Sequence, residues 1–443
     1  MERYDQLYRL YDEFDTETLR AHQAFVDLFP PLDSRVALTY WEDASDELAD
    51  LRAEIRDAFP GTGETYAAVA AHATRDQAFT GLDLATKYGR PVNALVLDVD
   101  ETLRSAGTTD NEIPRETLHL LTEFHEAGVP IVVCTGQTLE NVKGFLSQGL
   151  GNAVVNSGDV SVVYESGTGV FTPGHGPQTK RLLYEDLDEE VRSVFERLRQ
   201  RVLTDAPERV ARGCHLQGNE FNVTLKPNFE TGSEAAGEVI DDALVYLLDL
   251  LAVAVADYLD VSDDAIDAAA NADGDGDDSG DGDGDDGGRA VVGAAAGAWT
   301  RAFYAARDPE IRAVLDERGG APDGVDVPEA VSAFLDRVDV AYYEADAAEV
   351  VSRELNKPVG VEAAFEVLGI DDPFALVLGD SKSDLRVMEW IDGENAGIAA
   401  APEHASTVVL DHVRSTDDLV FPAGDAGDVL RTVYALNRLV SVE

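Results

Sequence analysis

Four short runs of apolar residues, separated by stretches of helical periodicity, most constrain how this chain of 443 residues can fold. The runs lie at 94–97, 131–134, 153–155 and 374–378, and none contains a charged residue. Such runs are typical of central strands in a parallel sheet, which are buried on both faces. Because helical stretches alternate with the runs, the sequence predicts an α/β fold with a doubly wound, Rossmann-like parallel sheet.

The runs fall in two separate parts of the chain, which predicts a core that is interrupted by an insertion. We expect the core to comprise residues 91–160 and 351–443, and an inserted α/β domain to occupy 161–350. Within the insertion, 221–225 alternates in polarity and predicts a half-buried strand. Residues 1–90 repeat apolar residues at helical spacing and predict a helical N-terminal extension, which serves packing or contact in a homo-oligomer.

An acidic tract within the insertion consists almost entirely of Asp and Gly. It runs over 273–288 and lacks the Glu that closes the calcium loop of an EF-hand. We therefore expect a disordered, solvated acidic loop over 271–288, and whether that loop binds cations stays open.

The charge balance of the chain excludes one class of partner. The sequence has 34 Lys and Arg against 86 Asp and Glu, a formal net charge of −52 at pH 7. Without a basic stripe to neutralise phosphates, nucleic acid is not expected as a partner. Acidic residues distributed along the whole chain, with few lysines, resemble the proteins of salt-accumulating archaea, so we interpret the chain as halophilic.

The remaining composition predicts a cytoplasmic protein with no membrane association. The two cysteines cannot form a disulfide framework, and residues 1–5 lack the apolar stretch of a signal peptide. The most apolar stretch, 243–259, contains Asp249 and Asp257 and predicts a buried helix instead of a membrane span.

Asp98 and Asp100 directly follow the first apolar run. Alternation along an extended chain places both side chains on the same side, where one carboxylate can attack phosphorus and the other can move protons. In a chain so rich in Asp, two aspartates at this spacing are weak evidence for a catalytic pair. The apolar strand directly before them strengthens the evidence, because chance seldom places the pair there.

Three further polar segments follow later runs or precede a helix, and the ends of parallel strands converge at one edge of a sheet. Thr135 and Gly136 can hold a phosphoryl oxygen, or they form a plain turn. Lys357 can offset negative charge there, or it is an ordinary surface lysine. Asp380 and Asp384 offer the hard oxygen ligands that Mg²⁺ prefers, or they belong to a solvated loop.

These four segments, in this order, resemble the four motifs of the haloacid dehalogenase superfamily. The place of the insertion resembles the large C2-type α/β cap domains of its sugar-phosphatase branches. The resemblance covers roughly 90–160 and 350–443. Members of these branches often have Gly where this chain has Glu101, Arg where it has Gln137, and Asn where it has Ser383.

The resemblance implies a role for each matched residue. Asp98 is expected to be the nucleophile and a magnesium ligand, and Asp100 the general acid/base with its carbonyl on the metal. Thr135, Gly136 and Lys357 are expected to bind the phosphoryl group. Asp380 and Asp384 are expected to bind Mg²⁺, the latter directly or through water.

Within the insertion, polar side chains concentrate at 214–226. His215, Asn219, Asn222 and Lys226 could line a polyol pocket, although a residue of this kind taken alone is more often a surface or structural residue. The sequence thus favours a magnesium-dependent phosphomonoester hydrolase that acts through a phospho-aspartyl intermediate on a small sugar or polyol phosphate. A phosphomutase of the same superfamily and a non-catalytic binding protein with this fold stay open as alternatives.

Overall fold

The computed structural model describes residues 2–29, 35–104, 112–219, 221–259, 286–318 and 324–442. The chain forms two compact units. The first comprises 1–181 and 357–443, and the second comprises 182–356.

The first unit is built around an eight-stranded sheet in the order β12-β11-β10-β1-β2-β3-β4-β5. The strands are β1 (Ala94–Leu97), β2 (Ile131–Cys134), β3 (Val160–Tyr164), β4 (Gly169–Phe171), β5 (Arg181–Leu182), β10 (Ala375–Leu378), β11 (Gly397–Pro402) and β12 (Leu419–Phe421). Pairing is parallel from β12 to β3, and β4 is antiparallel to β3. The predicted parallel sheet is therefore confirmed.

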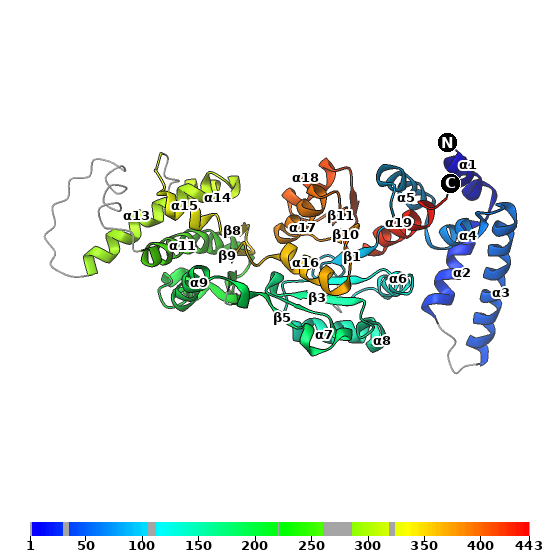
Figure 1. Ribbon diagram of the computed structural model, residues 1–443, viewed down its shortest axis with the longest axis horizontal. Helices are drawn as coiled ribbons and strands as arrows, with labels where there is room; N and C mark the ends of the chain where they lie inside the picture. The colour runs from blue at the N-terminus through cyan, green and yellow to red at the C-terminus, as the bar shows by residue number, and fades with distance from the viewer. Residues whose placement is uncertain are drawn as a thin grey trace. The chain divides into compact units, whose positions relative to one another are not determined.

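The register of the central strands aligns their carboxyl ends. Leu97 at the end of β1 lies opposite Leu378 of β10 and Val133 of β2. All residues of these three strands are buried, because helices cover both faces of the sheet. Figure 1 shows α7 and α16 on opposite sides of β3. The helices between and after the strands are α6 (Arg115–Glu126), α7 (Leu139–Gly149), α8 (Gly151–Val155), α16 (Lys357–Leu368), α17 (Lys382–Gly393), α18 (Thr407–Ser415) and α19 (Ala426–Leu439).

One predicted strand was wrong. Residues 153–155 belong to α8, and the third strand is β3, which pairs with β2 from Val160 opposite Ile131. A run of three apolar residues is as compatible with a buried helical turn as with a strand, and it cannot be assigned from periodicity. The β-branched residues of β3 fit a pleated surface better.

Five helices precede β1 within the described residues 2–29 and 35–88 of the first unit. They are α1 (Glu2–Glu13), α2 (Thr16–Leu28), α3 (Arg35–Ala58), α4 (Gly63–His72) and α5 (Arg75–Tyr88). Their buried residues, among them Leu7, Ile55 and Leu82, share one apolar core with Ala435 and Leu439 of α19. Figure 1 shows α19 next to α5. The oligomer contact expected for this segment stays a prediction.

The second unit has a four-stranded antiparallel sheet in the order β6-β7-β9-β8. Its strands are β6 (Cys214–Asn219), β7 (Asn222–Pro227), β8 (Val338–Tyr343) and β9 (Ala347–Ser352). Its helices are α9 (Glu189–Arg201), α10 (Glu208–Gly213), α11 (Ser233–Leu259), α13 (Asp286–Ala305), α14 (Pro309–Arg318) and α15 (Glu329–Leu335). The sequence 243–259 lies within α11, and no helix of the described ranges is long and apolar enough to cross a membrane.

Two details of the insertion differ from expectation. The strand expected to be half-buried, now part of β7, is buried on both faces over 222–225, because the hydroxyl of Thr224 donates to Asn222 Oδ1 at 2.6 Å and so satisfies its polar face internally. Residues 271–285 of the expected acidic loop lie outside the described residues. Residues 286–288 are instead the first residues of α13.

Candidate active site

The carboxyl ends of β1, β2 and β10 bring polar residues together at one edge of the sheet. Asp98 directly follows β1, Thr135 directly follows β2, and Asp380 comes two residues after β10. This edge is where open parallel sheets bind ligands.

Lys357 is the first residue of α16, and its side chain is only 3% exposed. Its Nζ donates to Asp98 Oδ1 at 2.9 Å and to Asp384 Oδ1 at 2.5 Å. Burial alone would lower the pKa of Lys357, but Asp384 and Asp98 outweigh it and raise that pKa well above its ordinary value. The lysine is therefore a fixed ammonium between two buried carboxylates.

Asp98, Asp380 and Asp384 form a carboxylate cluster in which one oxygen of each lies within 4.8 Å of the others. Burial raises the pKa of Asp98, and the charges of Asp384 and Asp380 raise it further against the opposing effect of Lys357. Burial and the charge of Asp384 raise the pKa of Asp380 to about 7. When all three carboxylates are ionised, one ammonium leaves two negative charges in excess, and hard oxygen donors with that excess fit a divalent cation such as Mg²⁺.

The turn after β10 fixes Asp384. Its Oδ2 accepts hydrogen bonds from the backbone N–H of Ser381 at 3.1 Å and from the Ser381 hydroxyl at 2.6 Å, a capping box at the start of α17. A Cβ on Gly379 would lie 2.3 Å from the Cβ of Asp384, so only glycine allows this approach. Asp384 therefore has a structural role in addition to its place in the cluster.

Asp100 lies apart from the carboxylate cluster, with a side chain that is 48% exposed. Its Oδ1 accepts from Arg104 Nε at 3.0 Å and Nη2 at 2.7 Å, and its Oδ2 accepts from Gln137 Nε2 at 2.6 Å. Between Asp98 and Arg104 the chain turns sharply, and Glu101 has a φ of 59°, in the left-handed region that favours glycine.

Thr135 and Gly136 form the turn between β2 and α7. Thr135 is buried, and its hydroxyl accepts a hydrogen bond from the backbone N–H of Gln137 at 3.1 Å. Gly136 is exposed, and a Cβ on it would have only the hydroxyl of Ser166 nearby, at 3.5 Å. These two residues lie at the same sheet edge as Asp98.

The four polar residues expected to line a polyol pocket lie on β6 and β7. His215 is paired with Lys226 across the two strands, and Asn219 with Asn222. Lys226 forms an ion pair with Asp346 at 3.2 Å, and Asn219 Oδ1 accepts from the backbone N–H of the residue two positions later at 2.8 Å.

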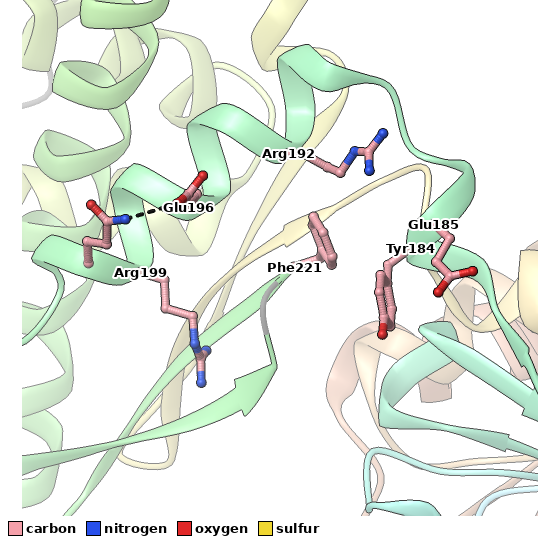
Figure 2. A pocket seen from close by; sticks show the side chains of 7 residues that line it. Tyr184, Glu185, Arg192, Glu196, Arg199 and Phe221 are labelled. Atoms are coloured by element: carbon pink, nitrogen blue, oxygen red, sulfur yellow. Dashed lines mark hydrogen bonds between the residues drawn. The ribbon is translucent and has the colours of Figure 1, made fainter.

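A pocket of about 490 Å³ in the second unit is lined by other residues. They are Tyr184, Glu185, Arg192, Glu196, Arg199, Gln200 and Phe221. Figure 2 shows the rings of Tyr184 and Phe221 beside α9, and their centroids are 5.7 Å apart in a stacked arrangement. Sequence reasoning missed this pocket, because the spacing of Arg192, Glu196 and Arg199 along one helix face also fits an ordinary solvated face.

No protein-family model matches the sequence, and no curated protein matches it. Solved structures of haloacid dehalogenase (HAD) superfamily hydrolases are similar at low identity. A HAD subclass IIB sugar phosphatase is 16% identical, with 76% of this chain and 96% of that chain covered and a TM-score of 0.38. Trehalose-6-phosphate phosphatase of Aspergillus fumigatus is 14% identical, with 81% and 97% covered and a TM-score of 0.38. A Thermoplasma acidophilum protein, 0175, is 12% identical, with 78% and 100% covered and a TM-score of 0.40.

Proposed function

We propose that this chain is a magnesium-dependent phosphomonoester hydrolase in which Asp98 is the nucleophile. One observation carries the proposal: a buried ammonium, that of Lys357, holds the carboxylate at the end of β1, and Asp380 and Asp384 complete a cluster of excess negative charge beside it. Buried carboxylates beside a strand end are unfavourable for stability, so their presence together at this edge supports a role in chemistry.

The reaction proceeds in two displacements. In the first, an oxygen of Asp98 attacks phosphorus, the bond from phosphorus to the alcohol oxygen breaks, and Asp100 gives a proton to the departing alcohol. In the second, water attacks the phospho-aspartyl group, Asp100 takes the proton from the water, and the Asp98–phosphorus bond breaks. The products are the alcohol and inorganic phosphate.

The other residues of the site bind and balance charge. Asp98, Asp380 and Asp384, with the carbonyl of Asp100, would hold the Mg²⁺, which when bound neutralises the oxygens of the transferring phosphoryl group. Lys357 favours the ionised, nucleophilic form of Asp98 and offsets phosphoryl charge. Thr135 and the backbone of Gly136 bind a phosphoryl oxygen in this proposal.

The proposed substrate is a small phosphate ester of a sugar or polyol. The pocket of the second unit supports this class, because it combines two aromatic rings with donors and acceptors from arginine, glutamate and glutamine side chains. His215, Asn219, Asn222 and Lys226 stay as proposed contacts to the alcohol.

Phosphate release with Mg²⁺ in molar KCl, over a panel of sugar and polyol phosphates, tests the proposal. We expect Asp98→Asn to lower turnover by at least ~10³-fold, as for loss of an essential nucleophile. Asp159→Asn, at an exposed aspartate that directly precedes β3, is the control and should retain turnover. Turnover by Asp98→Asn close to wild type would contradict the mechanism, and formation of an isomeric sugar phosphate without phosphate release would indicate a mutase.

A further inference from the structure

The carboxylate of Asp100 is held by two donors from different segments of the first unit. Arg104, four residues later, directs two N–H groups to Oδ1, at 3.0 and 2.7 Å. Gln137, from the turn after β2, directs Nε2 to Oδ2 at 2.6 Å. The orientation of Asp100 therefore depends on both side chains.

Both donors are themselves fixed by the backbone. The N–H of Arg104 donates to the carbonyl of Val99 at 3.1 Å, and its side chain is only 14% exposed. Gln137 donates its N–H to the Thr135 hydroxyl at 3.1 Å, and its carbonyl accepts from the N–H of Glu165 at 2.9 Å. Two donors anchored in this way restrict the rotation of a half-exposed carboxylate.

The hydrogen bonds from Arg104 and Gln137 leave one acceptor site of the Asp100 carboxylate for proton transfer. An ionised carboxylate has about four lone-pair sites, two on each oxygen. Arg104 occupies both sites of Oδ1, and Gln137 occupies one site of Oδ2. One site, on Oδ2, has no donor from these two residues.

We infer that Arg104 and Gln137 are positioning residues that present Oδ2 of Asp100 as the atom that carries the transferred proton. The inference rests on the proposed function. During attack by Asp98, the proton on Oδ2 passes to the departing oxygen as its bond to phosphorus breaks. During hydrolysis, a proton of the attacking water returns to Oδ2 as the phosphorus–water bond forms.

An exposed ion pair of the same spacing makes a matched control. Glu208 and Arg212 are also four residues apart with the carboxylate first, and Arg212 Nη2 lies 2.9 Å from Glu208 Oε1. Their side chains are 76% and 81% exposed, so this pair is expected to contribute little to either stability or activity.

The experiment compares kcat/KM for two aryl esters, with Mg²⁺ in molar KCl. p-Nitrophenolate leaves without protonation, whereas the more basic phenolate leaves far faster when it is protonated. We expect Arg104→Met to lower kcat/KM for phenyl phosphate by at least ~10-fold more than for p-nitrophenyl phosphate, since kcat/KM reports the first displacement. Gln137→Met should act in the same direction, Arg104→Lys should restore part of the loss, and Arg212→Met should change neither value.

The outcomes separate the inference from the function on which it rests. If Arg104→Met lowers kcat/KM equally for both esters, or lowers neither, the positioning role is overturned while the phosphatase activity stands. If the wild type releases phosphate neither from these two esters nor from the sugar and polyol phosphates, the proposed function fails, and the inference fails with it. If Arg104→Met still discriminates between the esters in an Asp100→Asn background, Asp100 is not the group that is positioned.

Discussion

Lys357 Nζ lies 2.5 Å from Asp384 Oδ1, and both side chains are less than 5% exposed. The pair joins the first turn of α16 to the first turn of α17, and it lies in the same unit as β1. A buried ion pair of this kind stabilises the fold only while every charge keeps its partner.

Lys357→Met is therefore expected to lower the free energy of unfolding by about 3–5 kcal/mol, because it leaves the carboxylates of Asp98 and Asp384 buried without their cation. Urea denaturation in molar KCl measures the change. Lys226→Met removes the ion pair with Asp346, in which the two side chains are 34% and 64% exposed. This substitution should lower the free energy of unfolding by less than about 1 kcal/mol. Equal effects of the two substitutions would contradict the interpretation of Lys357.

Asp380→Asn should change stability in opposite directions with and without Mg²⁺. Burial and Asp384 raise the pKa of Asp380 to about 7, so at about pH 8 its charge destabilises the metal-free fold. Without divalent cations, we expect the variant to unfold at a higher temperature than the wild type. Its free energy of unfolding should be larger by about 1–4 kcal/mol.

With Mg²⁺ in excess the order should reverse, because in the proposed site the cation would bind three carboxylates in the wild type and only two in the variant. Thermal unfolding with EDTA or with Mg²⁺ measures both orders. An Asp380→Asn variant that Mg²⁺ stabilises as much as it stabilises the wild type would exclude Asp380 from the metal site.

Glu101→Gly is expected to stabilise the protein. Glu101 has a φ of 59°, which costs a residue with a side chain about 1 kcal/mol or more, and glycine adopts this conformation freely. We expect a gain of about 0.5–1 kcal/mol, measured by urea denaturation. Glu140→Gly, in the first turn of α7, should instead lower stability by a similar amount, about 0.5–1 kcal/mol.

The stability of the N-terminal helices should decrease in acid through His72. Burial lowers the pKa of His72 to about 4, and its Nδ1 lies 2.9 Å from the carbonyl of Ala68. Below about pH 6.5 His72 is protonated in the unfolded chain but stays neutral in the folded chain. The free energy of unfolding therefore falls as the pH falls towards about 4.

The matched variant is His72→Phe, which keeps a ring against Tyr434, at a centroid distance of 4.6 Å in the wild type. As the pH is lowered from about 7.5 to about 4, the free energy of unfolding of the wild type should fall relative to that of the variant, by up to about 3 kcal/mol. A difference that does not depend on pH would show that folding leaves the pKa of His72 unchanged, and would contradict the prediction.

Low ionic strength should destabilise the whole chain. With a formal net charge of −52, repulsion between acidic side chains is long-ranged until salt screens it. The screening length falls from about 10 Å at ~0.1 M salt to about 3 Å at ~1 M, so we expect the melting temperature to rise by about 10 °C or more over this range. KCl and NaCl should act alike, and a melting temperature that is unaffected by either salt would contradict the prediction.

The sheet core could be predicted because its strands are short, wholly apolar and buried on both faces. Ala94–Leu97 and Ile131–Cys134 are strands over the expected residues. Residues 153–155 were assigned wrongly because a run of three apolar residues does not distinguish a strand from a buried helical turn.

The residues of the candidate site could be predicted from the sequence, but the contacts between them could not. Strand ends indicated Asp98 and Asp380, whereas the position of Lys357 between two carboxylates depends on packing across 259 residues of sequence. Asp100 is followed by Glu101, whose backbone is in the left-handed region. A sequence does not indicate this conformation when the residue is not glycine, so the contacts of Asp100 could not be predicted. The pocket beside α9 was missed because charged residues at helical spacing read equally as a solvated face.

The packing of α19 against the N-terminal helices has a consequence for synthesis. Gln77 of α5 donates to Asp428 of α19 across 351 residues, and Ala435 and Leu439 complete the apolar core around Leu82. The five helices leave the ribosome long before α19 does, so their apolar faces are exposed while the rest of the chain is still being translated. The apolar surface that α5 buries against α19 therefore stays uncovered until the last helix of the sheet unit has been translated.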